Sequence, residues 1–173
     1  MYTVRKAEKQ DCGLIHDLAG QVWEPTYGNI LSKEQVDYMF DRMYSVPSLE
    51  NQMDNGHTYY ILYHDEKPAG YLSIERERKD LFHLQKIYIL PDQQRNGGGK
   101  LLIEKAEQHV TEHAETPVCT IELNVNRNNK AVGFYKKRGF VIDREGDFDI
   151  GNGFYMNDYV MKKTVRIRRD FRF

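Results

Sequence analysis

The sequence predicts a mixed α/β (α+β) fold, and three patterns of apolar residues support this prediction. Residues 11–53 repeat their apolar side chains at helical spacing. Residues 57–90 alternate or run apolar, as consecutive antiparallel strands do. Residues 99–162 follow the order helix, strand, helix, strand, strand. A chain of 173 residues, 40% of them hydrophobic, can bury one core of this kind.

The chain is expected to begin with a short strand and a helix. The strand covers Tyr2–Lys6. The helix begins at Asp11 and is stopped by Pro25 and Gly28, because proline lacks an amide donor and glycine favours a helix end. The inward side of this helix is formed by Leu14, Ile15, Leu18, Val22 and Trp23.

Two further helices are predicted before residue 57. Ser32 begins the first of them, and Gln35 three positions later predicts a capping box. The apolar stripe of this helix is formed by Val36, Met39, Phe40 and Met43. A short helix over 48–53 follows it.

Three strands are predicted in the middle of the chain. Thr58–Tyr63 is aromatic and β-branched, and residues 65–68 form a turn. Gly70–Arg78 alternates, so one face carries Tyr71, Ser73, Glu75 and Glu77. Leu81–Leu90 is nearly all apolar at its end, which predicts cover on both faces, and Pro91 ends it.

The last elements lie within one domain, residues 1–163, which is followed by a basic tail, residues 164–173. The elements are expected as a helix over 99–113, a strand over 118–125, a helix over 129–137 capped by Gly139, and strands over 140–144 and 154–162. The basic residues in and beside the tail are Lys162, Lys163, Arg166, Arg168, Arg169 and Arg172. The tail is open to three roles: an added strand, a contact with a second copy in a homodimer, or a contact with an anionic surface.

Composition excludes several classes of protein. With 25 basic and 26 acidic residues the net charge is −1, which argues against a general nucleic-acid binder. There is no apolar run long enough for a membrane span and no signal-peptide core, so the expected compartment is the cytoplasm. Cys12 and Cys119 fit no metal spacing and no disulfide framework, and we expect no metal site.

The segment 87–102 is the sharpest functional signal, because a strand, a turn, three glycines and a helix follow one another. Successive amides without side-chain shielding can wrap an anion, and the helix N-terminus adds partial positive charge. Arg95 and Lys100 add full charges. A phosphate or pyrophosphate is therefore the predicted ligand, with a mobile glycine turn as the alternative interpretation.

Two common nucleotide-binding motifs do not fit this segment. A Walker A loop needs glycine and serine or threonine where Gln94 and Leu101 stand. A dinucleotide fingerprint starting at Gly97 needs a third glycine where Leu102 stands.

Two motifs resemble those of the Gcn5-related N-acetyltransferases. Gln94-x-x-Gly97-x-Gly99 resembles the acetyl-CoA pyrophosphate loop of that family. Asn128-x-x-Ala131-x-x-Phe134-Tyr135-x-x-x-Gly139-Phe140 resembles its later helix motif. Together they cover about the second half of the chain. The segment Leu84–Tyr88 is most similar to bacterial polyamine or small-amine acetyltransferases.

The resemblance implies a fold and a reaction. The fold is a mixed, mostly antiparallel sheet of about seven strands with helices on both faces, splayed near Leu90 where acetyl-CoA enters. In the reaction a primary amine attacks the thioester directly, and Tyr135 protonates the leaving thiolate. The implied cofactor contacts are Ile87, Tyr88, Ile89, Gln94, Arg95, Asn96, Gly97, Gly98, Gly99, Lys100, Asn128 and Tyr135. Alternatively, Tyr135 is a core aromatic. Asn128 is also a candidate helix N-cap, which is compatible with a ligand contact.

The attacking amine must lose a proton, because a primary amine with a pKa of about 10.4 is almost fully charged at pH 7. His83, counted back from Gln94, stands where some members of the family carry a glutamate base. Glu75 on the neighbouring strand and Glu122 are rivals, and a chain of water molecules is a further alternative. His83 and Gln85 share a strand face unless a bulge intervenes.

The acceptor is the least determined part of the prediction. The implied acceptor-binding residues are Trp23, Glu24, Tyr27, Tyr71 and Gln85, since aromatic rings and a carboxylate suit a cation. Alternatively, Trp23 is core and Glu24 is solvated. We expect a polyamine or another small amine as the acceptor. The alternatives are a protein or peptide amine, and an acetyl-CoA-binding regulatory module without catalysis.

Overall fold

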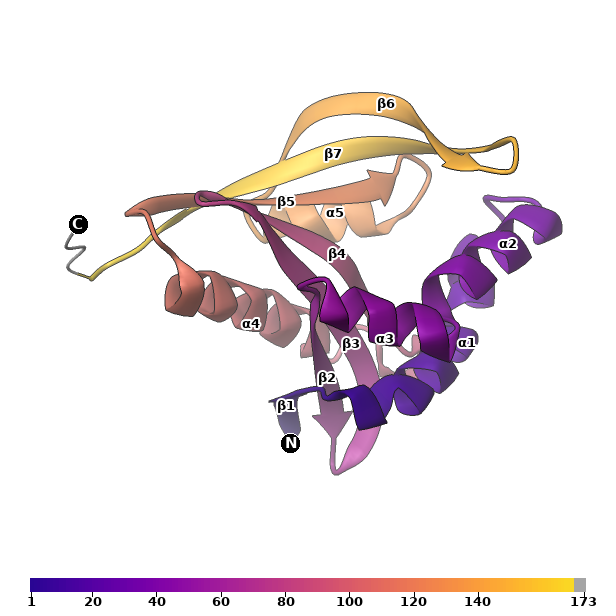
Figure 1. Ribbon diagram of the computed structural model, residues 1–173, viewed down its shortest axis with the longest axis horizontal. Helices are drawn as coiled ribbons and strands as arrows, with labels where there is room; N and C mark the ends of the chain where they lie inside the picture. The colour runs from indigo at the N-terminus through magenta and orange to yellow at the C-terminus, as the bar shows by residue number, and fades with distance from the viewer. Residues whose placement is uncertain (170–173) are drawn as a thin grey trace.

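A computed structural model describes residues 1–169 of the chain. Its strands and helices, in chain order, are β1 (Tyr2–Lys6), α1 (Cys12–Tyr27), α2 (Lys33–Tyr44), α3 (Val46–Asp54), β2 (Thr58–His64), β3 (Lys67–Arg78), β4 (Leu81–Ile89), α4 (Gly98–His113), β5 (Val118–Asn126), α5 (Ala131–Lys137), β6 (Val141–Gly151) and β7 (Phe154–Arg166) (Figure 1). The predicted α/β fold is confirmed.

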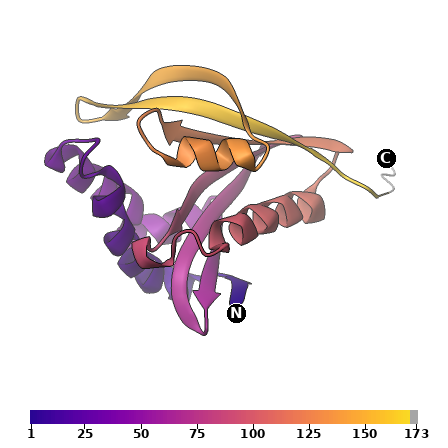
Figure 2. The same ribbon diagram turned by 180° about the vertical axis from the view of Figure 1, so that it is seen from behind.

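One seven-stranded sheet runs through the molecule in the order β1-β2-β3-β4-β5-β7-β6. Neighbouring strands are antiparallel except β4 and β5, which are parallel. These two strands pair only where Leu81–His83 meets Thr120–Glu122. Beyond His83 they diverge, so the sheet opens into two halves (Figures 1 and 2). The predicted splay is present and already begins several residues before Leu90.

Helices cover both faces of the sheet, and each face has its own core. Helices α4 and α5 pack on one face over apolar residues of β2 to β5 and β7. Helices α1, α2 and α3 pack on the other face around an aromatic cluster (Figure 2). The largest members of this cluster are Trp23, Tyr27, Tyr44, Tyr59 and Tyr71.

Helix α1 does not stop at Pro25, as the sequence predicted. It continues through the proline to Tyr27, and the amide of Gly28 still donates to the Glu24 carbonyl at 2.8 Å. A proline in the last turn removes only one backbone hydrogen bond. Trp23 and Tyr27, on either side of it, are both buried and hold that turn against the sheet.

The predicted capping box at Ser32 is only half formed. The Ser32 hydroxyl accepts from the amide of Gln35 at 3.1 Å, which confirms the N-cap. The Gln35 side chain donates instead to the carbonyl of Tyr155 at 2.7 Å. Tertiary contact with β7 therefore displaces the local capping interaction, and it ties α2 to the C-terminal hairpin.

Strands β6 and β7 extend beyond their predicted ends at residues 144 and 162. The sequence of β6 is rich in aspartate and glycine, so its strand propensity is low, and it is held by pairing with β7 along its length. Residues 164–166, the first of the predicted tail, continue β7 and pair with β5. Arg169 donates to the carbonyl of Ala114, whereas Arg172 lies outside the described residues.

Within residues 1–169, no helix has the length and hydropathy needed to cross a bilayer.

Candidate active site

The opening of the sheet leaves one edge of β4 without a strand partner. On its other edge, Ile87, Tyr88 and Ile89 pair with β3. On the β5 side, pairing stops at His83. Backbone donors and acceptors on an unpaired edge can bond an extended ligand as another strand would. This is where the sequence placed the arm of acetyl-CoA.

The glycine loop presents main-chain amides at the start of α4. Gly97 has φ +90°, a conformation that glycine adopts readily. The amide of Leu101 donates to the Gly97 carbonyl at 3.3 Å, so the amides of Gly98, Gly99 and Lys100 precede this helical bond. They point out of the N-terminus of a 16-residue helix, which favours an anion. The residues present therefore fit the pyrophosphate of acetyl-CoA.

Gly98 and Gly99 serve packing as well. A Cβ atom at Gly98 would lie 2.8 Å from the Leu62 side chain. A Cβ atom at Gly99 would lie 2.9 Å from the Phe134 ring of α5. These contacts fix α4 against the sheet and against α5, which argues against a mobile glycine turn.

Asn128 is exposed, and its side chain makes no hydrogen bond within residues 1–169. Its backbone amide donates to Asn126 Oδ1 at 2.9 Å. Asn129, rather than Asn128, accepts from the Ala131 amide at 2.9 Å at the start of α5. The N-cap interpretation of Asn128 is therefore wrong, and its side-chain amide stays available to a ligand.

Tyr135 of α5 is a core aromatic residue, and its protonation state is compatible with the predicted role as an acid. Its ring packs against Phe140 with centroids 5.9 Å apart, and the residue is 7% exposed. Burial first, and then the neighbouring Tyr27, raise the pKa of the phenol, so it stays protonated at neutral pH. Tyr27 in turn shares a hydrogen bond of 2.8 Å with the hydroxyl of Tyr88 on β4. Three tyrosines from α1, β4 and α5 thus come together at the splay.

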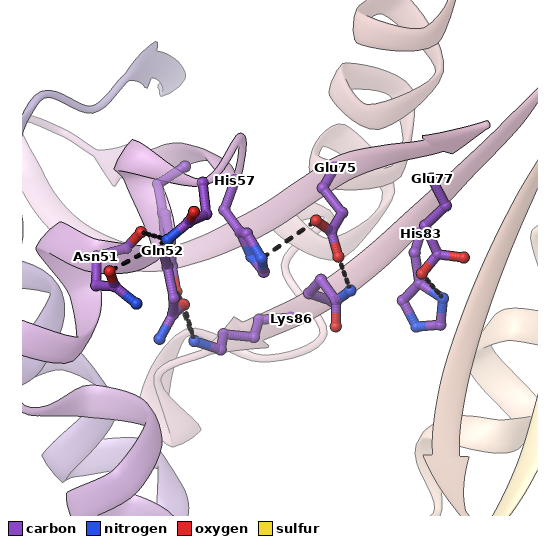
Figure 3. Close-up of polar contacts among 10 residues, drawn as sticks. Asn51, Gln52, His57, Glu75, Glu77, His83 and Lys86 are labelled. Carbon is purple, nitrogen blue, oxygen red and sulfur yellow. Dashed lines mark hydrogen bonds and ion pairs between the residues drawn. The ribbon is translucent and has the colours of Figure 1, made fainter. Parts of the chain in front are cut away.

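A β-bulge decides which residues of β4 share a face. Ser73 pairs with Lys86 but Ile74 pairs with Leu84, so Gln85 is the extra residue. Glu75 lies opposite His83. Its carboxylate accepts from Gln85 Nε2 at 2.6 Å and lies 3.2 Å from His57 Nε2 (Figure 3). His57 was not predicted as a site residue, because it lies far from Glu75 in sequence.

His83 belongs to a neighbouring group. Its Nδ1 lies 3.4 Å from Glu77 Oε1 (Figure 3). It lies 3.7 Å from Glu122 Oε1, and both distances are too long for good hydrogen bonds. Burial lowers the pKa of His83 despite these carboxylates. The three donor atoms lie within 4.8 Å of one another, close enough to share a cation. Because Arg144 already lies 3.4 Å from Glu122, we assign no metal to this group.

The predicted acceptor-binding residues are largely inaccessible. Trp23, Tyr27 and Tyr71 are 2%, 5% and 0% exposed within the aromatic cluster. Glu24 is exposed on the other side of α1. Trp23 and Tyr71 are therefore core residues, because α2 and α3 cover them, and the interpretation of Trp23 as core and Glu24 as solvated is correct. Tyr27 still reaches the splay through its hydroxyl.

Two buried ionisable residues were not predicted from the sequence as site residues. Lys86, 5% exposed, donates to the Tyr59 hydroxyl at 2.5 Å and to Gln52 Oε1 at 2.7 Å (Figure 3). Asp158 on β7 is also 5% exposed. Its signal in the sequence is an acidic residue at an inward strand position, between the buried Met156 and Val160.

Comparison with known proteins identifies the family. The profile of the acetyltransferase (GNAT) domain matches residues 29–163, and the chain belongs to this family. The family predicted from the two motifs is thereby confirmed.

Among curated relatives, the peptidyl-lysine N-acetyltransferase YjaB of Salmonella typhimurium is 34% identical over 85 residues, 49% of this chain and 50% of that protein. The chain thus aligns with about half the length of that relative. The spermidine N(1)-acetyltransferase of Thermoplasma acidophilum is 23% identical over 92% of this chain and 95% of that protein. A crystal structure of PaiA N-acetyltransferase from the same archaeon, in complex with coenzyme A, has a TM-score of 0.77 and 23% identity, covering 94% and 98% of the two chains.

Proposed function

We propose that this enzyme acetylates a primary amine of a polyamine or a similar small amine by direct attack on acetyl-CoA. One observation carries the choice of acceptor. Glu75, His83 and Glu122 lie side by side across β3, β4 and β5 where the sheet begins to open, and Glu77 adjoins them. We call these four residues the acidic row. Its three carboxylates, of which Glu122 lies 3.4 Å from Arg144, favour an acceptor with more than one positive charge.

The reaction uses residues of both halves of the sheet. The β4 edge, the α4 amides and Asn128 would hold acetyl-CoA, which supplies the thioester. Tyr135 keeps its proton at neutral pH and gives it to the leaving sulfur. Glu75 and His83 are the candidates for taking the proton of the amine, directly or through water. Gln85 and His57 orient the Glu75 carboxylate, which favours Glu75.

A peptidyl-lysine acceptor is the second candidate, and the YjaB similarity favours it. A lysine side chain is also a primary alkylamine, so the acidic row would suit it. The two candidates differ in what surrounds the amine: a polyamine carries further charges, whereas a peptide carries a polypeptide backbone. A chain that only binds acetyl-CoA, as a regulatory module, is the third.

The test is thiol release from acetyl-CoA with spermidine, spermine, lysine peptides, N-terminal peptides and aminoglycosides. We expect the highest kcat/KM for the polyamines. A higher value for lysine peptides would replace the proposal by the second candidate, and silence across the panel with tight acetyl-CoA binding would favour the regulatory module. With the active amine, Glu75→Gln should lower kcat more than His83→Gln. Equal, small effects would indicate a chain of water molecules.

A further inference from the structure

Asp158 is a buried carboxylate that lacks a cationic partner. Its Oδ2 accepts from Asn124 Nδ2 at 3.3 Å, but its Oδ1 is enclosed and has no hydrogen-bond partner within residues 1–169. Nor does any side chain of that range form an ion pair with it. Arg127, whose charge acts on Asp158, is held by Asp147 at 2.8 Å and lies 3.7 Å from Glu145. Burial accordingly raises the pKa of Asp158.

An arrangement of this kind is unfavourable for the protein alone. A carboxylate taken out of water needs a positive charge or several donors to replace its hydration, and Asp158 has one neutral donor. Such groups persist where function requires them, and perturbed buried carboxylates are concentrated at functional sites. The missing partner is therefore expected to be a ligand that carries a positive charge.

The position of Asp158 indicates which ligand this is. It lies opposite Asn126, the last residue of β5, on the β5–β7 side of the splay. The negative charge of Asp158 contributes to raising the pKa of Tyr27. The Tyr27 hydroxyl shares a hydrogen bond with the Tyr88 hydroxyl, and Tyr27 contributes to raising the pKa of Tyr135. Figure 1 shows the end of β5 and the beginning of β7 on the side of the molecule where α1 and α2 lie. The charge of Asp158 thus acts on Tyr27, one of the three tyrosines at the splay.

We propose that Asp158 binds an ammonium group of the acceptor other than the amine that reacts, at the end of β5. The inference rests on the proposed amine acetylation and adds a site to it. Asp158 supplies the negative charge, Asn124 holds one of its oxygens, and the other oxygen is the one left without a donor. A primary ammonium group offers three donors and can replace the hydration that Oδ1 lacks.

A second anionic position lies farther along the same face. Glu122 and Asn126 are four residues apart on β5, about 13 Å at a strand rise of about 3.3 Å per residue, and the even spacing directs both to one face. Asn124 lies between them. Asp158 and the acidic row are therefore two separate anionic sites, which favours an elongated acceptor with an ammonium group at each end.

The experiment compares Asp158→Asn with Asp37→Asn, a matched change at an exposed carboxylate of α2. The full chain is assayed for spermidine acetylation, coenzyme A affinity and thermal unfolding. Asp158→Asn should lower kcat/KM for spermidine about 10- to 100-fold, the range of a charge-assisted hydrogen bond. Coenzyme A affinity should stay within twofold. The Tm should be equal or higher, because the buried charge is gone and the amide oxygen can still accept from Asn124. Asp37→Asn should change none of these.

A fall in kcat/KM without a fall in Tm distinguishes a binding role of Asp158 from a structural role. A Tm that falls with the activity, or an unchanged kcat/KM, would overturn the proposal. Spermidine should also raise the Tm of the wild type but not that of Asp158→Asn, a readout that needs no turnover. If spermidine stabilises only the wild type yet is not acetylated, the ammonium site stands and the proposed function fails. If spermidine is acetylated but raises the Tm of both proteins equally, the proposed function stands and the ammonium site at Asp158 is refuted.

Discussion

Replacing Lys86 with methionine should stabilise the protein at neutral pH, and the gain should shrink as the pH rises. Lys86 is 5% exposed, and within residues 1–169 no carboxylate pairs with it. Its ammonium group lies instead 4.4 Å from the centre of the Tyr44 ring. Burial lowers its pKa from 10.5 to about 7. Methionine fills a similar volume without a charge.

The sign and size of the effect follow from proton linkage. The unfolded chain keeps Lys86 protonated up to about pH 10.5, whereas the folded chain releases the proton near pH 7. The unfolded state therefore binds more protons in this window, and wild-type stability rises with pH across it. At about 1.36 kcal/mol per pKa unit, the charge costs about 4 kcal/mol at pH 7. Lost hydrogen bonds to Tyr59 and Gln52 offset about 1–3 kcal/mol, leaving a net gain of about 1–3 kcal/mol.

Urea denaturation at pH 7.5 and pH 9.5 measures the difference in the free energy of unfolding between Lys86→Met and the wild type. The difference should narrow by about 2–3 kcal/mol between the two pH values, since about 1.4 kcal/mol is recovered per pH unit. Lys79→Met, at an exposed turn, is the control and should differ from the wild type equally at both. A Lys86 difference that does not change with pH would refute the buried-charge reasoning.

The other predictions concern the loop, the acid and one buried histidine. Tyr135→Phe should lower kcat about 100-fold at unchanged acetyl-CoA KM, while Tyr155→Phe, 52% exposed, keeps wild-type rates. Gly97→Val should weaken coenzyme A binding at least about tenfold by calorimetry, because valine resists φ +90° at the anion site. Gly56→Val imposes similar strain at φ +97° and should lower the Tm alone; equal coenzyme A affinities would remove the loop from the cofactor site. Burial first, and then His113 and other nearby cations, lower the pKa of His109 from 6.5 to about 4. The unfolded chain therefore binds the extra proton between these values, stability should fall as the pH drops from about 6.5 to 4, and thermal melts of His109→Gln should show a flatter profile.

The structure of the segments proposed to bind the cofactor was predictable because local sequence determines it. The backbone at Gly97, the amides that follow and the helix with Tyr135 each depend on neighbours in the chain. The fold class followed for the same reason, from the local periodicity of its segments.

The acceptor half depends on tertiary contacts that periodicity does not encode. Trp23 and Tyr71 suit a cation site by residue type, yet α2 and α3 bury them. The bulge at Gln85 determines to which face of the sheet the His83 side chain belongs, and no residue near it in sequence predicts that bulge. Asp158 comes close to Tyr27 only because β7 inserts beside β5.

The short pairing between β4 and β5 has a mechanical consequence. Within residues 1–169, three residue pairs join these two central strands, so the two halves of the sheet are connected over a short length. A cofactor bound along the free edge of β4 would add backbone hydrogen bonds at this edge. It would then stabilise the arrangement of the two halves of the sheet as well as supply a reactant. Amides of residues 85–89 that face β5 should then exchange hydrogen more slowly once the cofactor is bound.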